Sequence, residues 1–222
     1  MDNIFYDFGD VNVVFGNCKK TCDIIEDTVN ELSDLKIKPL TIGGEHSLTI
    51  GVLNSLTEKY DDLTVVHLDA HRDLADTFIG EEYSHASVMK RVHEMSIKEL
   101  IQIGIRSASK EEENFVENHS NIMTFKSNEV FSHLDNIEYY LSAVDTPIYL
   151  SIDMDVFDPS VAPTVGNPTP GGILYDHIEA ILKTLSLKNV VGMDVVETAG
   201  DRLGDITAVL ASKIIYDFLS LL

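Results

Sequence analysis

The stretch that decides the fold is Leu63-Thr64-Val65-Val66-His67-Leu68-Asp69-Ala70-His71-Arg72-Asp73. Residues 63–68 form a short, mostly apolar and β-branched run, which is typical of a buried parallel strand. Three potential metal ligands follow at once, since Asp69, His71 and Asp73 are spaced two residues apart. In an extended segment this spacing puts all three side chains on one side, so they can face a common point.

Two other apolar runs end in the same kind of cluster. Residues 39–42 lead into Gly43-Gly44-Glu45-His46-Ser47, and residues 147–152 lead into Asp153-Met154-Asp155. An isolated Asp after a strand is commonly a turn or helix-cap residue. Three such clusters together suggest a ligand-binding site, because open parallel sheets bind ligands beyond the carboxyl ends of their strands. We therefore expect the clusters to meet at one edge of a sheet, together with Glu197, which follows the last expected strand.

The clusters supply a hard, mostly oxygen ligand set. Its six members are His46, Asp69, His71, Asp73, Asp153 and Asp155. Two imidazoles and four carboxylates favour manganese over zinc and leave no place for a soft metal. The four aspartates bring a charge of about −4 to the site, which two divalent cations would neutralise. The sequence therefore predicts a dinuclear centre with its metals about 3.5 to 4 Å apart.

Strand-like and helix-like segments alternate from end to end, which predicts an α/β fold with a mainly parallel sheet. The expected strands are 11–15, 39–42, 63–68, 100–105, 121–125, 147–152 and 190–196. The expected helices are 21–35, 48–59, 85–95, 110–118, 128–143, 174–185 and 206–219. Residues 158–172 concentrate proline and glycine, which is typical of an ordered loop. No repeat or linker divides the sequence, so we expect a single domain over residues 1–222.

Composition limits the class of protein. The 222 residues carry 16 Lys and Arg against 37 Asp and Glu, a net charge of −21. Such a charge repels nucleic acid and anionic membranes and attracts metal ions or a cationic substrate, although it also serves simply to keep a surface soluble. No apolar run approaches the ~18 residues of a membrane span. The N-terminus also lacks the pattern of a secretory signal, so we expect a soluble, cytoplasmic protein.

The three clusters and their flanks resemble the three signatures of the ureohydrolase family, which comprises arginases and agmatinases. The matching segments are 43–47, 67–73 and 151–159. The resemblance continues through the proline- and glycine-rich residues 163–172 and through Asp194-Val195-Val196-Glu197. It covers nearly the whole chain and implies an arginase-like three-layer α/β/α fold with a mainly parallel sheet. It also implies a homo-oligomer, either a trimer or a hexamer.

The resemblance further implies two Mn²⁺ ions and hydrolysis of a guanidinium group to urea and an amine. One metal would be held by His46, Asp69, Asp73 and Asp153, and the other by His71, Asp69, Asp153 and Asp155. A guanidinium is resonance-stabilised, so neutral water is too weak to attack its carbon. A hydroxide bridging the two metals would be strong enough, because metal binding lowers the pKa of water from 15.7 to about 7.

Three residues carry the expected catalytic roles. Asp73, a ligand beside the nucleophile, would receive its proton and pass it to the leaving nitrogen. Glu197 would hold the substrate guanidinium through charge-assisted hydrogen bonds, the alternative being a helix-cap or surface acid. His85 would lie near the substrate and shuttle protons to bulk water, the alternative being packing at a helix N-terminus.

The loop after the second cluster bears on the substrate. Arginases recognise the α-amino and α-carboxylate groups of arginine with an Asn- and Ser-rich loop at this place. Residues 74–83 contain no Asn and no basic residue but three acids. This loop favours a substrate that ends in an amine, and agmatine, giving putrescine and urea, is the leading expectation. The alternative substrates are guanidinobutyrate, arginine and formiminoglutamate, the last of which would give formamide in place of urea. A further alternative is a non-catalytic, metal-binding role.

Some residues depart from the family pattern or lie outside it. The usual N-terminal strand unit is missing before the segment that starts near Asp7. Arg72 stands between two ligands, where it would either cover the site or point away. We expect His67 to point to the opposite face of its strand, into the core. No ligand role is expected for the remaining histidines, which are His93, His119, His133 and His177.

Overall fold

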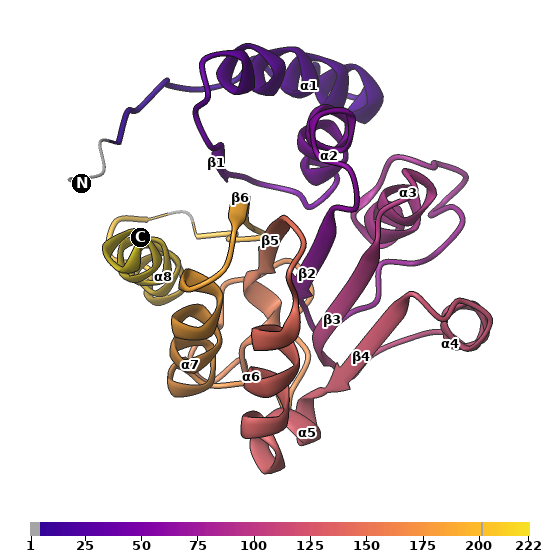
Figure 1. Cartoon of the computed structure of the whole chain (residues 1–222), viewed down its shortest axis with the longest axis vertical. Helices are drawn as coiled ribbons and strands as arrows, with labels where there is room; N and C mark the ends of the chain where they lie inside the picture. Colours follow the sequence, from indigo (N-terminus) through magenta and orange to yellow (C-terminus); the bar gives the residue numbers. More distant parts are fainter. Residues whose placement is uncertain (1–4, 201) are drawn as a thin grey trace.

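The computed structural model describes residues 5–200 and 202–222 and is built on one six-stranded sheet (Figure 1). The strand order is β1-β6-β5-β2-β3-β4, and every pair of neighbours is parallel. The strands are β1 (Leu40–Ile42), β2 (Thr64–Leu68), β3 (Glu99–Ile105), β4 (Ile122–Lys126), β5 (Ile148–Asp153) and β6 (Val190–Val196). The predicted parallel α/β sheet is confirmed.

Helices cover both faces of the sheet, so the molecule has three layers (Figure 1). One face is covered by α1 (Cys18–Asp34), α2 (Leu48–Lys59), α3 (Val88–Glu94) and α4 (Lys110–Glu117). The other is covered by α5 (Ser127–Ser132), α6 (Leu134–Ala143), α7 (Tyr175–Ser186) and α8 (Ile206–Leu221). Successive side chains of a strand point to opposite faces. Val65 accordingly packs in the first core and Val66 in the second, which explains why the strands are apolar on both sides.

The predicted strand over residues 11–15 is wrong. Val13 and Phe15 are 61% and 96% exposed, and this segment pairs with no strand in the described part of the chain. It ends in a turn, in which the backbone N–H of Asn17 donates to the carbonyl of Val14. The side chain of Asn17 then accepts from the backbone N–H of Lys20 and begins α1. A β-branched composition does not make a strand where no neighbouring strand is available for pairing.

Two predicted helices are divided. Residues 128–143 form α5 and α6, which are separated at His133, whose φ of −144° and ψ of 40° are not helical. Residues 85–95 begin as a 3₁₀ turn, η1 (His85–Ser87), before α3. The remaining predicted elements are present with small shifts at their ends. Among the helices in the described ranges, none has both the length and the apolar character that a membrane span requires.

Candidate metal centre

The carboxyl ends of three strands bring all six predicted ligands together. His46 lies between β1 and α2, Asp69, His71 and Asp73 follow β2, Asp153 ends β5, and Asp155 lies in the 3₁₀ turn η2 (Met154–Val156). Strands β2 and β5 pair in register, with Leu68 opposite Ile152, so the ligands that follow them begin side by side. The shared edge of the parallel sheet therefore builds the site, as expected for this class of fold.

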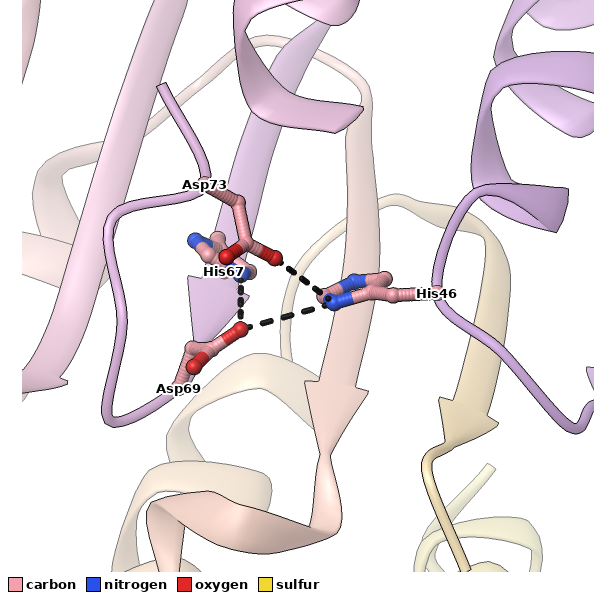
Figure 2. Close-up of side chains that lie close together, drawn as sticks. All are labelled: His46, His67, Asp69 and Asp73. Atoms are coloured by element: carbon pink, nitrogen blue, oxygen red, sulfur yellow. Dashed lines mark hydrogen bonds and ion pairs between the residues drawn. The ribbon is translucent and has the colours of Figure 1, made fainter. Parts of the chain in front are cut away.

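His46 is the centre of the first group of ligands. Its Nδ1 lies 3.4 Å from Asp69 Oδ2, 3.2 Å from Asp73 Oδ2 and 3.3 Å from Asp153 Oδ2. Figure 2 shows Asp69 and Asp73 converging on this nitrogen from one side of the His46 ring. The nitrogen is buried and has no hydrogen-bond partner among the described residues. A buried, unpartnered imidazole nitrogen that faces three carboxylate oxygens is what a cation site requires.

The second group of ligands lies on the other side of Asp69. His71 Nδ1 is 3.4 Å from Asp69 Oδ1 and 2.9 Å from Asp155 Oδ2. Asp69 is fully buried and presents one oxygen to His46 and the other to His71. This is the geometry of a carboxylate that can bridge two cations.

Backbone N–H groups hold three of the four carboxylates in place. Asp69 Oδ1 accepts from the N–H of His71 at 2.6 Å, and Asp153 Oδ1 accepts from the N–H of Asp155 at 2.7 Å. Asp155 Oδ1 in turn accepts from the N–H of Ala70 at 3.0 Å, which ties the η2 turn to the segment after β2. Asp153 and Asp155 therefore keep their second oxygen for the pocket, while Asp69 presents both of its oxygens there.

The crowding of these acids makes the pocket favour positive charge. Burial and the neighbouring charge of Asp69 raise the pKa of Asp73 to about 8, that of Asp155 to about 6, and that of Asp153 well above its usual range. Burial alone would lower the pKa of His46, but Asp153, Asp69 and Asp73 raise it well above its ordinary value. Divalent cations supply such charge, and two imidazole nitrogens with carboxylate oxygens are suitable donors for them. The residues present therefore fit a dinuclear cation site.

The prediction for His67 is wrong. Residues two apart on a strand share a face, so His67 lies on the side of Asp69, and its Nε2 is 2.8 Å from Asp69 Oδ2 (Figure 2). The side-chain NH₂ of Gln102 lies 3.1 Å from His67 Nδ1. Because Nδ1 accepts this hydrogen bond, Nε2 carries the proton and donates it to Asp69. Although His67 belongs to one of the groups that could hold a metal ion, its hydrogen bonds make it a support for Asp69.

Arg72 points away from the ligands and is 2% exposed. Its Nη1 donates to Gln102 Oε1 at 3.0 Å and to Thr124 Oγ1 at 2.9 Å, and its Nη2 donates to Glu113 Oε2 at 2.9 Å. A guanidinium can only donate hydrogen bonds, so it fixes which end of the Gln102 amide faces His67. Of the two expected orientations of Arg72, the structure shows the one that leaves the site uncovered.

Glu197 lies at the end of β6 against the loop that carries His46. Its backbone N–H donates to the carbonyl of Gly44 at 2.7 Å, and its Oε1 accepts from the backbone N–H of His46 at 2.8 Å. A methyl group at Gly166 would lie 2.8 Å from Glu197 Oε2, so this glycine makes room for the second oxygen. Glu197 and Asp73 both have left-handed backbones, with φ of 63° and 55°, a conformation that is costly for glutamate and less so for aspartate.

His85 lies at the rim of the site. Its side chain is 48% exposed, and its Nδ1 is 3.4 Å from Glu45 Oε1. The ring also packs edge-on against Phe78, with a centroid distance of 5.0 Å. His85 is therefore connected to the loop that carries His46 through Glu45. Among the described residues, His85 makes no direct contact with the six ligands.

Several supporting residues were not anticipated from the sequence. Arg106 donates to the carbonyls of Asp155 and Thr169, both at 2.7 Å, and so joins the η2 turn to the proline- and glycine-rich loop. From that loop, Asn167 Nδ2 and Thr169 Oγ1 lie 3.1 and 3.3 Å from His71 Nε2. Asp194 is the single acid inside the apolar strand 190–196, a sequence signal of a buried polar role.

Known proteins are similar to this chain in sequence. A model of the arginase family matches residues 2–220. A 32.2 kDa protein of Methanothermus fervidus without an assigned function is 42% identical over 99% of this chain and 76% of its own length. The N(1)-aminopropylagmatine ureohydrolase of Thermococcus kodakarensis is 38% identical over 95% of this chain and 71% of its own length. The agmatinase of Bacillus cereus is 37% identical over 97% of this chain and 74% of its own length.

The fold is shared as well. A crystal structure of a Clostridium difficile protein assigned as an agmatinase superposes with a TM-score of 0.87 at 32% identity. The match covers 97% of this chain and 78% of that one. The family model extends over almost the whole sequence, and the relatives exceed 35% identity over most of their own length. The chain belongs to the arginase family.

Proposed function

We propose that the chain cleaves the guanidinium group of agmatine, releasing putrescine and urea, with two Mn²⁺ ions as cofactors. The observation that carries this proposal is the convergence of two histidines and four aspartates on one buried pocket, with Glu197 tied to the same loop as His46. The Bacillus cereus relative named agmatinase supports the choice of substrate. Manganese is proposed because the ligand set is hard and rich in oxygen.

The six side chains divide into two sets according to which imidazole each oxygen faces. His46, Asp73, Asp153 and Oδ2 of Asp69 are assigned to one cation, and His71, Asp155 and Oδ1 of Asp69 to the other. Asp69 would thus contact both cations, and the family resemblance implies that Asp153 would do so as well. When bound, the two cations lower the pKa of water and so supply a nucleophile at neutral pH.

The residues of the chain would then position the substrate and move protons. Glu197 keeps Oε1 on the backbone of His46, which leaves Oε2 to accept from the guanidinium and orient its carbon over the pocket. Asp73, whose side chain is 9% exposed, would take a proton on its carboxylate and return it to the leaving nitrogen. His85 at the exposed rim would exchange protons with bulk water.

Acidic side chains near the rim favour a substrate whose tail is an amine. Glu45 beside His85 is 41% exposed. Glu82 and Asp76, in the loop that precedes His85, are 63% and 84% exposed and share one cation, Arg91, at 3.9 and 3.4 Å, so the acids of this loop outnumber their partner. These carboxylates attract a second positive charge and disfavour the carboxylates of arginine, guanidinobutyrate or formiminoglutamate. N(1)-aminopropylagmatine is a second candidate substrate, because a relative of that specificity is 38% identical.

The test is urea release by the purified, Mn²⁺-loaded chain. The assay would present agmatine, N(1)-aminopropylagmatine, arginine and guanidinobutyrate separately, with formamide release from formiminoglutamate alongside and metal content measured on the same sample. Urea from agmatine with about two Mn per chain is the expected result. Urea from N(1)-aminopropylagmatine alone would reassign the substrate, and two Mn without any product would contradict a catalytic role.

We also propose that the chain forms one domain over residues 1–222 and works as a homo-oligomer, a trimer or a hexamer, in the cytoplasm. One sheet covered on both faces by cores of buried side chains supports the single domain. Cys18 and Cys22 are both free, as is usual in a reducing compartment. Light scattering of the purified protein would give the oligomeric state.

A further inference from the structure

We propose that Asp194, acting through Ser151, fixes the tautomer of His46 and thereby makes His46 Nδ1 a metal ligand. Asp194 is a positioning residue in this scheme, since it touches neither a cation nor the substrate. The inference rests on the metal centre of the proposed function and is independent of which guanidino compound is cleaved.

The three residues form a continuous hydrogen-bonded chain inside the protein. Asp194 on β6 and Ser151 on β5 are partners in the strand register, and both are fully buried. Ser151 Oγ lies 2.8 Å from Asp194 Oδ1 and 2.9 Å from His46 Nε2. The other oxygen of Asp194, Oδ2, accepts from the hydroxyl groups of Thr49 at 2.7 Å and Tyr149 at 2.6 Å. Asp194 is therefore surrounded by three hydroxyl donors.

Counting protons fixes the direction of this chain. A carboxylate only accepts hydrogen bonds, so the single hydroxyl proton of Ser151 is directed at Asp194. Ser151 can then only accept from His46, which places the imidazole proton on Nε2. Metal binding requires the neutral imidazole, which carries one N–H, so in that form Nδ1 presents its lone pair. That nitrogen is the one facing Asp69, Asp73 and Asp153, where a lone pair among carboxylates is favourable only with a cation between them.

An isosteric substitution can reverse the direction of these hydrogen bonds. The reason is that Asp194 Oδ2 has two hydroxyl donors, whereas Oδ1 has one. In Asp194→Asn the amide oxygen will occupy the position that receives two hydroxyl donors, from Thr49 and Tyr149. The amide NH₂ will then face Ser151 and donate to it. The Ser151 hydroxyl proton then has lost its acceptor at position 194, and His46 Nε2 is the other partner of Ser151 Oγ. Turning the hydroxyl to donate to Nε2 satisfies that proton and places the proton of His46 on Nδ1. An N–H would then point into the pocket where the lone pair is needed.

Mn²⁺ binding without substrate tests the proposal directly. The wild-type protein, Asp194→Asn, Ser151→Ala, the double variant and Tyr149→Phe would be dialysed against MnCl₂, and bound metal would be measured together with the EPR signal of the coupled Mn pair. Asp194→Asn is expected to weaken the His46 site about 10–100-fold, the usual effect of losing a partner behind a ligand. It would therefore retain about one Mn and lose the pair signal. Tyr149→Phe, which removes a donor to Oδ2 and leaves Ser151 unaffected, is expected to keep both ions.

The double variant separates positioning from a general structural role. Without the Ser151 hydroxyl, the amide introduced by Asp194→Asn can no longer impose the wrong tautomer on His46. The double variant is therefore expected to bind Mn²⁺ as Ser151→Ala does and better than Asp194→Asn. A merely structural role predicts the opposite order, with the double variant the weakest. Should Asp194→Asn fail to fold, a weaker His46 site in Ser151→Ala, restored in Ser151→Thr, supports the same conclusion.

The two proposals fail in different ways. Two Mn in both the wild-type protein and Asp194→Asn, or equal losses in Asp194→Asn and Tyr149→Phe, would overturn the inference alone. Two Mn in the wild-type protein and one in Asp194→Asn would support the inference even if no urea were released. No Mn binding by the wild-type protein would overturn both the metal centre and the role of Asp194.

Discussion

Glu197 accepts a 2.8 Å hydrogen bond from the backbone N–H of His46, so a proposed guanidinium-binding carboxylate is held by the loop that carries a proposed metal ligand. The return contact, from the N–H of Glu197 to the carbonyl of Gly44, makes this loop and the end of β6 one unit. Any shift of the His46 loop therefore moves Glu197 with it. If Glu197 binds the guanidinium as proposed, this coupling would fix the distance between the guanidinium carbon and the metal pocket, on which the rate would depend strongly.

Gly166→Ala should reduce activity without loss of metal. The added methyl group would lie 2.8 Å from Glu197 Oε2, at the mobile end of a side chain, so Glu197 would move and the fold would persist. A displacement of about 1 Å at a reacting group costs about 100-fold in rate, and we expect a fall of about that size in kcat/KM for agmatine with two Mn retained. Gly44→Ala is the matched control, because its added methyl meets nothing within 4 Å. Equal losses in the two variants would refute the role of Gly166.

Asp155→Ala and Glu197→Gln should separate metal binding from substrate binding. Asp155 contacts His71 Nδ1 at 2.9 Å, so its removal is expected to release one Mn and to abolish nearly all activity. Glu197→Gln keeps the size of the side chain but weakens the charge-assisted hydrogen bonds to a guanidinium. It should hold two Mn and lose at least about 10-fold in kcat/KM. Elemental analysis and urea assays on the same preparations decide the matter, and equal metal loss in both variants would remove the role assigned to Glu197.

Arg106→Lys should loosen the His71 side of the centre. The guanidinium of Arg106 spans the carbonyls of Asp155 and Thr169, which one ammonium cannot replace with the same planar geometry. We expect about 2 kcal/mol of lost stability and weaker binding of one Mn, measured by urea denaturation and equilibrium dialysis. The exposed Arg202 provides a control, since Arg202→Lys should stay within about 0.5 kcal/mol. Unchanged Mn binding in Arg106→Lys would contradict the link.

The benefit of Mn²⁺ for stability should grow as the pH rises. In the metal-free protein the pKa of Asp155 is raised to about 6 and that of Asp73 to about 8, whereas an unfolded Asp has a pKa of about 3.9. The folded chain then binds more protons than the unfolded chain, so its stability falls as the pH rises through this range. Metal binding requires deprotonated carboxylates and strengthens in the same direction. The difference in Tm between Mn²⁺-loaded and chelator-treated protein should therefore widen from about pH 5 to about pH 8, and a constant or shrinking difference would contradict this.

Local sequence was sufficient where a residue follows a strand. The apolar runs before His46, Asp69 and Asp153 fixed the strand ends, and parallel pairing of those strands then brought the clusters together. The prediction from local sequence failed at His67. Residues two apart on a strand share a face, so His67 lies on the same side of β2 as Asp69 and not on the opposite side. The prediction failed also at residues 11–15, because a strand depends on a neighbour that a local pattern does not specify.

The supporting contacts could not be obtained in this way. Ser151 and Asp194 are 43 positions apart and meet only because β5 and β6 are adjacent. The orientation of Arg72 depends on Gln102 and Thr124, which come from two further strands. A lone polar residue in an apolar strand can be recognised from sequence, but its hydrogen-bond partner is set by strand order and register.

Asp73 and Glu197 both have left-handed backbones, so the residue that is best for stability at these two positions differs from the residue that activity requires. Glycine adopts this conformation at little cost, and asparagine and aspartate adopt it at lower cost than other residues, so the strain is greater at Glu197 than at Asp73. A randomised library at positions 73 and 197 that is sorted for expression and heat resistance should become enriched in Gly and Asn. The same library sorted for urea production should return to Asp and Glu. At these two sites, a consensus built from the most stable variants would select against catalysis.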